Sequence, residues 1–332
     1  MPELRRAAII GVGRGGCELA SRLCRTGFPG FTYAVLDVER QVLKQSPIAR
    51  RLLLQHCTDH RHLAYENLLI GKAALKKELP GFLKLLSGKS LIIFIGTLTD
   101  EDSLYGIPNL AEAARAPGRI TAAIVHLPSP SGASGQFFLR SLPLFCDCVL
   151  PLITPDRRTD TPYGSTEELS CRLAAKVRVL GEFLRVPDFA DVNLYLNGQD
   201  DALKALRHGG FTAYAGATAC GKNALNRVLR EISLQLNLSL QTSEAMLTQR
   251  LLLHVSCPLM KNPDTLIELL KELNATLNRQ HRILGVHYAD DPDLVPGSVA
   301  ISALLTGLPL SHFRLKPHLS EALSESERQA PG

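Results

Sequence analysis

The glycines between Gly11 and Gly16 are the residues whose spacing most directly predicts chemistry. Gly11, Gly13 and Gly16 satisfy the pattern G-x-G-x-x-G and follow the apolar residues 7–10, which predict a buried strand. Residues 18–25 then have helical character. A strand, a glycine turn and a helix aim backbone N–H groups and the positive end of the helix at a phosphate, and side chains larger than glycine would hold the phosphate away. The segment therefore predicts a nucleotide site.

Asp37 closes the next predicted strand, residues 33–36. Its distance from the glycines suits an acid that hydrogen-bonds the ribose of a dinucleotide. The glycines and Asp37 together fit an NAD(P)-dependent oxidoreductase. The second half of the sequence offers no paired Lys/His/Tyr constellation for such chemistry. The oxidoreductase therefore stands as the alternative interpretation.

A histidine-rich stretch is a further candidate for chemistry. His56 and His60 are four residues apart and would share a helical face, where Cys57 or Asp59 could complete a metal site near His62. Nothing in the surrounding sequence predicts a rigid scaffold for these ligands. We interpret the stretch as a polar connector and predict no metal site.

Composition narrows the class of protein. The chain has 332 residues, of which 45% are hydrophobic and 21% charged, as in a soluble globular protein with room for two domains. The net charge of +5 is scattered, and no basic run is interleaved with aromatic residues, so nucleic-acid binding is not predicted. No apolar run reaches membrane-spanning length, and the first strand begins too early to leave room for a signal peptide. The eight cysteines lie mostly in apolar segments, and we expect reduced core residues of a cytoplasmic protein.

Strands and helices alternate through the first half of the sequence. Further strands are predicted at residues 90–95, 119–125 and 148–153, and helices at residues 41–54, 65–86, 102–115 and 135–142. This alternation predicts an α/β fold with a doubly wound parallel sheet. The ligand of such a sheet binds at the carboxyl ends of its strands, where Gly96 and Thr97 follow the third strand.

One long helix and a second set of strands follow. Thr166 to Leu184 has apolar residues at helical spacing behind the capping box Ser165–Glu168, and would extend roughly 28 Å. Four strands and two helices beyond it predict a smaller second α/β domain: strands at residues 211–216, 250–255, 282–288 and 298–304, and helices at 222–236 and 264–279. We therefore predict a nucleotide-binding domain at residues 1–163, a central helix with its following loop at 164–187, a second domain at 188–310 and a tail at 311–332.

Several segments resemble FtsZ. Residues 9–23, IIGVGRGGCELASRL, resemble its glycine-rich opening, and residues 34–43, AVLDVERQVL, resemble the segment that reaches towards the ribose. Residues 187–192, PDFADV, resemble the loop that FtsZ inserts into the nucleotide site of the neighbouring subunit, and residues 284–308 look like its closing strand pair. The order of these pieces agrees as well. The chain thus resembles the tubulin/FtsZ superfamily over about residues 7–308.

This resemblance implies a function. It implies a cytoskeletal or membrane-remodelling protein of the cell-division type, which binds GTP or GDP, takes Mg²⁺ with the nucleotide, and forms filaments head to tail with its own copies or with an FtsZ-like relative. Membrane association would then be indirect. Asp188 and Asp191 match the two catalytic acids of the inserted loop. Cofactor binding is implied for these residues: Gly11, Gly13, Arg14, Gly15, Gly16, Asp37, Gly96 and Thr97.

The chain departs from the resemblance at its second phosphate loop. Only Gly96 remains of the expected glycines, and Asp100, Glu101 and Asp102 stand in the loop. A carboxylate about 5 Å from a phosphate charge costs roughly 3 kcal/mol at an effective dielectric constant near 20. We therefore predict a degenerate GTP site with weak or absent GTPase activity.

Two residues have a second interpretation. Arg14 stands where FtsZ has glycine, and it could either pair with phosphate or fill the site by pairing with Asp100 or Asp102. Asp188 could simply cap a helix that begins at Phe189.

Overall fold

The chain divides into two compact units. Residues 1–174 and 309–332 make the first unit, and residues 175–308 make the second. The computed structural model describes residues 7–26, 31–54, 78–98, 101–127, 133–153, 166–183, 205–207, 209–236, 250–257, 283–291, 293–310 and 313. Within those ranges, no helix is both long and apolar enough to cross a membrane.

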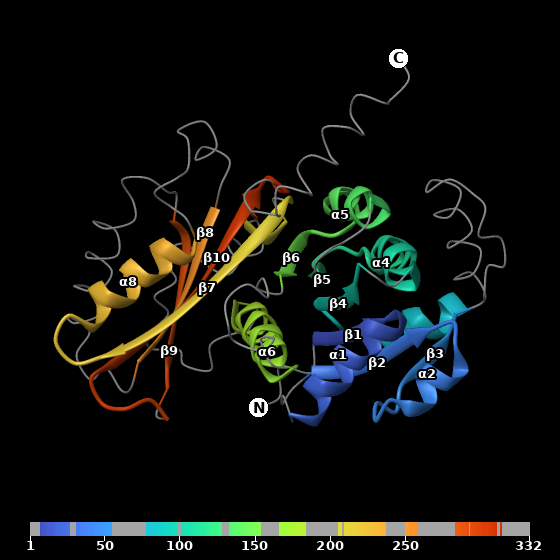
Figure 1. The fold of residues 1–332 in the computed structure, drawn as a ribbon, viewed down its shortest axis with the longest axis horizontal. Helices are drawn as coiled ribbons and strands as arrows, with labels where there is room; N and C mark the ends of the chain where they lie inside the picture. Colours follow the sequence, from blue (N-terminus) through green and yellow to red (C-terminus); the bar gives the residue numbers. More distant parts are fainter. Residues whose placement is uncertain are drawn as a thin grey trace, which may run out of the picture. The chain divides into compact units, whose positions relative to one another are not determined.

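The first unit is built on a parallel sheet (Figure 1). Its strands are β1 (Ala7–Val12), β2 (Phe31–Asp37), β3 (Arg51–Leu53), β4 (Leu91–Thr97), β5 (Ile120–Leu127) and β6 (Cys148–Ile153). They lie in the order β3-β2-β1-β4-β5-β6, and all the pairs are parallel. Because β1 is flanked by β2 on one side and β4 on the other, the strand order reverses at β1, which is where such sheets bind ligands. The predicted doubly wound sheet is confirmed.

Helices cover this sheet. They are α1 (Gly13–Arg25), α2 (Arg40–Gln45), the helical residues 78–85, α4 (Glu101–Ala114) and α5 (Ala133–Phe145). Helix α1 packs on β1, β2 and β4, and it also contacts α4, which contacts α5. Strands β1 and β4 are buried along their whole length, as expected for continuous apolar strands of a parallel sheet. Most of the helix predicted at residues 65–86, up to residue 77, lies outside the described residues.

The helix predicted at residues 41–54 is wrong. Helix α2 ends at Gln45, and the edge strand β3 follows at Arg51–Leu53. The reason is local, because Pro47 disfavours a helical conformation in the residue before it, and Ser46 is extended (φ −73°, ψ 136°). The buried turn is closed by hydroxyl groups: Ser46 Oγ lies 2.8 Å from Ser21 Oγ of α1.

Helix α6 (Thr166–Phe183) connects the two units, whose boundary falls between Ala174 and Ala175. The predicted helix ends only one residue later. Its second half packs in the second unit: Lys176 Nζ lies 5.1 Å from the ring centroid of Tyr214, and the ring of Phe183 meets His254 edge-on at 6.4 Å.

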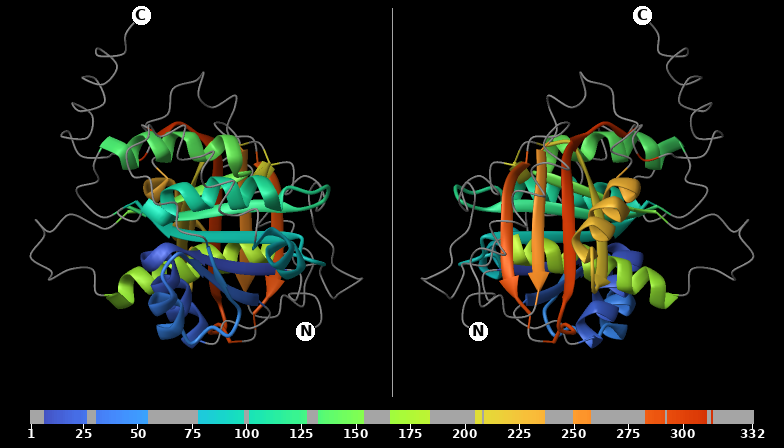
Figure 2. Two further views of the ribbon diagram at one scale, coloured as in Figure 1. Left: turned by 90° about the vertical axis from the view of Figure 1, so that its right-hand side faces the viewer. Right: turned by 90° about the vertical axis from the view of Figure 1, so that its left-hand side faces the viewer.

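The second unit holds a mixed sheet. Its strands are β7 (Phe211–Cys220), β8 (Arg250–Cys257), β9 (Ile283–Asp290) and β10 (Ser298–Leu308), in the order β7-β10-β8-β9 (Figure 2, right). Strand β10 is antiparallel to β7 and β8, whereas β8 and β9 are parallel. Helix α8 (Ala224–Gln235) packs on β7 and β10. The helix predicted at residues 264–279 lies outside the described residues.

The described cysteines are free thiols that differ in burial, and Cys24 is intermediate. Cys17, Cys146, Cys148 and Cys257 are buried, as predicted for core residues. Cys171 on α6 and Cys220 at the end of β7 are exposed instead. Apolar neighbours in sequence therefore did not guarantee burial at these two positions.

Candidate functional site

The glycine turn, residues Gly11–Gly16, forms the junction between β1 and α1. Strand β1 passes into the helix without an intervening loop, and Val12 is the N-cap in an extended conformation (φ −120°, ψ 127°) with no side-chain capping bond. Gly13 has φ 71°, a left-handed value that favours glycine. The positive end of α1 therefore lies at the carboxyl edge of the sheet, where β1, β2, β4 and β5 end.

Two of the glycines allow close packing. A Cβ atom on Gly11 would lie 2.5 Å from the carbonyl oxygen of Gly16 and 2.8 Å from Cβ of Ala20. A Cβ atom on Gly16 would overlap the carbonyl oxygen of Ile95 in β4. Since neither backbone oxygen can move without shifting an element, these glycines hold α1 tightly against β1 and β4.

Arg14 pairs with Glu39. Its Nη2 lies 3.0 Å from Glu39 Oε2 and 3.1 Å from Oε1, and the two side chains are 71% and 50% exposed. The sequence suggests phosphate, Asp100 or Asp102 as the partner of Arg14. The guanidinium instead joins the first turn of α1 to the residue before α2. This contact could have been anticipated, because Glu39 follows the strand that neighbours β1.

Asp37 is buried, with only 1% of its surface exposed. Its Oδ1 accepts a hydrogen bond of 2.7 Å from the backbone N–H of Glu39. The carboxylate thus shapes the turn that presents Glu39, and its predicted role towards a ribose stays a prediction. Glu39 is the exposed acid at the end of β2.

Thr97 lies against the glycine turn from the end of β4. It is 6% exposed, and its methyl group occupies the space that a side chain on Gly15 would need. Thr97 pairs in register with His126 of β5, and the N–H of Leu98 donates to the carbonyl oxygen of His126 at 3.0 Å. Burial lowers the pKa of His126, so its imidazole is neutral near pH 7.

Two of the three acids expected in the second phosphate loop begin a helix. Glu101 and Asp102 are the first residues of α4. Other predicted residues lie outside the described part of the chain: Asp100, Asp188, Asp191, His56, His60 and His62. In the ranges that the structure does describe, no group of three His, Cys, Asp or Glu residues could hold a metal ion.

The site therefore combines a helix end, a tight glycine turn and a guanidinium group, which together suit an anionic ligand such as a phosphate. The structure brings together the predicted residues at the ends of β1, β2 and β4: Gly11, Gly13, Arg14, Gly15, Gly16, Asp37, Gly96 and Thr97. It adds Glu39, which the sequence motifs do not single out, and it places His126, near the end of β5, at the same edge. The assignment of these residues to nucleotide binding stays a prediction.

Comparison with curated proteins supports the resemblance seen in the sequence. The cell division protein FtsZ 1 of Archaeoglobus fulgidus is 25% identical over 227 residues, which are 60% of this chain. The match spans 61% of the relative, about three fifths of its length. No protein-family model matches the chain.

Solved structures show the same fold. An empty FtsZ dimer of M. jannaschii is 17% identical, with a TM-score of 0.67 over 91% of this chain and 88% of that one. The GDP-bound monomer of CetZ1 from Haloferax volcanii is 17% identical, with a TM-score of 0.68 over 97% and 99% of the two chains. The chain therefore has the fold of FtsZ and CetZ, and the predicted fold class is confirmed. Nothing in these comparisons supports the oxidoreductase.

Proposed function

We propose that this FtsZ-like chain is a cytoskeletal subunit that assembles with its own copies or with an FtsZ-like relative, and that its guanine-nucleotide site is degenerate. Its fold and its similarity to FtsZ 1 support the cytoskeletal part of the proposal. One of the similar solved structures is an FtsZ dimer, which supports self-association as the mode of assembly. The glycine turn at the reversal of strand order supports a nucleotide as the ligand.

The contacts around the first turn of α1 are the main support for the proposal that the nucleotide site is degenerate. Thr97 fills the space beside Gly15, and Arg14 is engaged by Glu39. A phosphate that binds here has to recruit Arg14 away from Glu39 while it lies near that carboxylate. Both requirements reduce the free energy gained on binding.

Glu39 competes only weakly with a phosphate for Arg14. An ion pair as exposed as Arg14–Glu39 contributes only about 0.2–1 kcal/mol. Glu101 and Asp102 add negative charge at the start of α4. The combined effect favours weak nucleotide binding over complete loss. The residues that would hold the phosphates are the backbone of Gly13 to Gly16 and the side chains of Arg14 and Thr97.

Hydrolysis depends on the neighbouring subunit in this proposal. Asp188 and Asp191 would approach the nucleotide of the next copy from the inserted loop, as the resemblance to FtsZ implies. Mg²⁺ would accompany a bound nucleotide and neutralise part of the phosphate charge. With the phosphate weakly held, water activation by these acids would be inefficient, so we propose weak or absent GTPase activity.

Calorimetric titration of the purified full chain with GTP and Mg²⁺ tests this proposal. We expect binding weaker than micromolar and no GDP carried through purification. Micromolar or tighter binding, or retained GDP, would show that the site is intact. An NADH titration monitored by fluorescence serves as the comparison, because enhanced emission of the reduced cofactor would instead support the oxidoreductase.

A further inference from the structure

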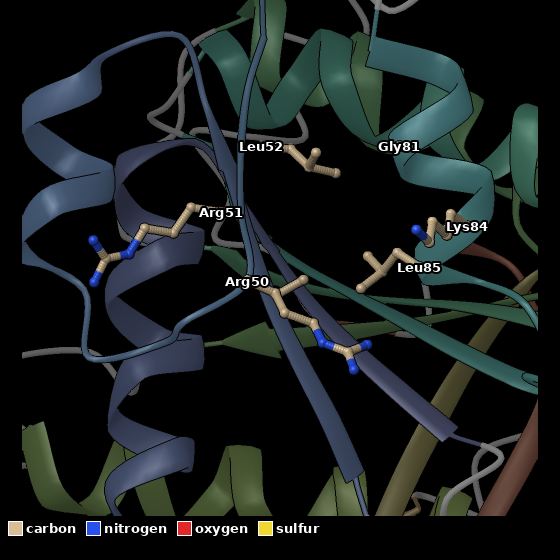
Figure 3. Close-up of a pocket in the computed structure, with 7 residues that line it drawn as sticks. Arg50, Arg51, Leu52, Gly81, Lys84 and Leu85 are labelled. Carbon is tan, nitrogen blue, oxygen red and sulfur yellow. The ribbon is translucent and has the colours of Figure 1, made fainter.

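A pocket lies in the first unit, away from the glycine turn. It has a volume of about 330 Å³ and lies between strands β2 and β3 and the helical residues 78–85 (Figure 3). Arg50 immediately precedes β3, so the pocket extends towards the amino end of that strand. The glycine turn lies at the opposite, carboxyl edge of the parallel sheet. The two features are therefore separate.

The pocket exists because small residues face it. Ala34 of β2 is fully buried and contributes only a methyl group to the lining. Gly81 contributes no side chain, and a Cβ atom there would lie 3.4 Å from Leu52 Cδ2, an ordinary van der Waals contact. Leu52 and Leu85 complete an apolar lining, and Figure 3 shows them pointing into the space between the strand and the helix.

The rim of the pocket is basic. The guanidinium of Arg51 is occupied by backbone contacts, because its Nε and Nη2 donate to the carbonyl oxygens of Ile48 and Ser46 at 2.9 and 2.7 Å. Its side chain points away from the pocket in Figure 3. Arg50, which precedes β3, and Lys84, on the helical residues 78–85, are both exposed. Neither side chain makes a hydrogen bond or ion pair with the part of the chain that the structure describes.

We infer that this pocket binds a small amphipathic anion, with an apolar body between Leu52 and Leu85 and a carboxylate, sulfonate or phosphate between Arg50 and Lys84. The volume is at the lower end of the range for small-molecule sites, which also combine an apolar lining with a few polar groups. A purely apolar ligand would leave both cations without a partner. A purely ionic ligand would leave the lining uncovered.

Fluorescence titration with anilinonaphthalene sulfonate, an amphipathic anion, tests the inference on the folded full chain. We expect saturable binding at one site with enhanced emission. Octanoate should displace the dye, whereas octanol, which has the same chain length without the charge, should not. Absence of saturable binding, or equal displacement by octanol, would overturn the inference.

Variants locate the dye. Arg50→Gln/Lys84→Gln should weaken dye binding by roughly tenfold, because two charge-assisted contacts are lost. Arg25→Gln/Lys44→Gln removes the same charge from exposed positions outside the pocket and should change binding by less than about twofold. Equal effects of the two pairs would show that the dye responds only to net charge and would reject the pocket.

A third variant fills the pocket without changing its charge. Gly81→Leu adds a side chain towards Leu52 from an exposed helical position, so the fold should persist, which circular dichroism and the thermal midpoint would verify. Dye binding should be lost. Undiminished dye binding in this variant would contradict the inference. So would displacement of the dye by GTP and Mg²⁺, which would place it at the glycine turn. The result is independent of whether the proposed function holds.

Discussion

Arg14 and Glu39 are joined by a two-point ion pair, with Nη2 of the arginine 3.0 and 3.1 Å from the two carboxylate oxygens. The pair connects the first turn of α1 to the end of β2. It is held in place on one side, because the buried carboxylate of Asp37 bonds to the N–H of Glu39. In our proposal, Glu39 therefore competes with phosphate for Arg14.

Replacing Glu39 should strengthen nucleotide binding. In Glu39→Gln, Arg14 is released from its ion pair, and we expect GTP affinity to rise about two- to fivefold, matching the value of an exposed ion pair. Titration with a fluorescent GTP analogue in the presence of Mg²⁺ measures this change.

Two variants control that experiment. Glu18→Gln breaks the ion pair with Arg22 on the same helix and should leave affinity nearly unchanged. Arg14→Gln/Glu39→Gln should lose the gain seen in the single variant. A gain that survives without Arg14 would mean that Glu39 acts only by its charge.

Gly16→Ala should destabilise the first unit. The new Cβ atom would overlap the carbonyl oxygen of Ile95, so α1 has to move from β4, and we expect a loss of about 2–3 kcal/mol in the free energy of unfolding. Urea unfolding measures the loss. Gly81→Ala is the matched control: its Cβ atom meets only Leu52 at 3.4 Å, and it should stabilise the helix by up to about 1 kcal/mol. Equal stabilities of the two variants would disprove the packing role of Gly16.

Stability should fall in mild acid partly through His126. Burial lowers the pKa of this imidazole from its ordinary value of 6.5. Below pH 6.5 the imidazole is protonated in the unfolded chain but remains neutral in the native chain. The contribution of His126 to the free energy of unfolding is therefore fully present above pH 6.5 and decreases as the pH falls towards the native pKa. His126→Gln should reduce the slope of unfolding free energy between about pH 7 and pH 5. An unchanged slope would show that other groups account for it.

Because hydrolysis is weak or absent in our proposal, Asp188 and Asp191 should serve mainly in adhesion between copies. We predict nucleotide-independent polymers that are lost in Asp188→Ala/Asp191→Ala, because these acids would pair with Arg14 of the next copy across the interface. Light scattering and negative-stain microscopy, with and without GTP and Mg²⁺, measure assembly. Glu78→Ala/Glu167→Ala removes two acids elsewhere and should assemble normally. Polymers that require GTP, together with phosphate release abolished by the aspartate variants, would show instead that the acids are catalytic.

The sequence was most informative where burial is continuous. Strand β6 was predicted with its actual bounds, Cys148–Ile153, because an uninterrupted apolar run bounded by polar residues leaves little choice. The helix predicted at residues 41–54 failed because apolar spacing was read across Pro47. Strand β3 is short and only partly buried, so its pattern was too weak to reveal it.

Side-chain partners were less predictable than elements. The glycines predicted the turn, and the Arg14–Glu39 pair follows from β2 lying next to β1, but the glycine motif itself specifies no partner for Arg14. The pocket near Lys84 was harder still, because it arises from two small residues, Ala34 and Gly81, that lie far apart in the chain. A pocket formed in this way has no sequence motif by which it could be predicted.

The strand order also has a consequence for synthesis on the ribosome. Ala7 of β1 pairs with Phe31 on one side and with Leu91 on the other, 84 residues further along the chain. At 5–20 residues per second, roughly 4–17 s separate the emergence of Ala7 from that of Leu91. During that time the strand that leads into the glycine turn has one open hydrogen-bonding edge, which other nascent chains could occupy. The strand that leads into the glycine turn thus waits longer for its second partner than for its first, and the yield of this protein in cells should depend on chaperones that shield that edge.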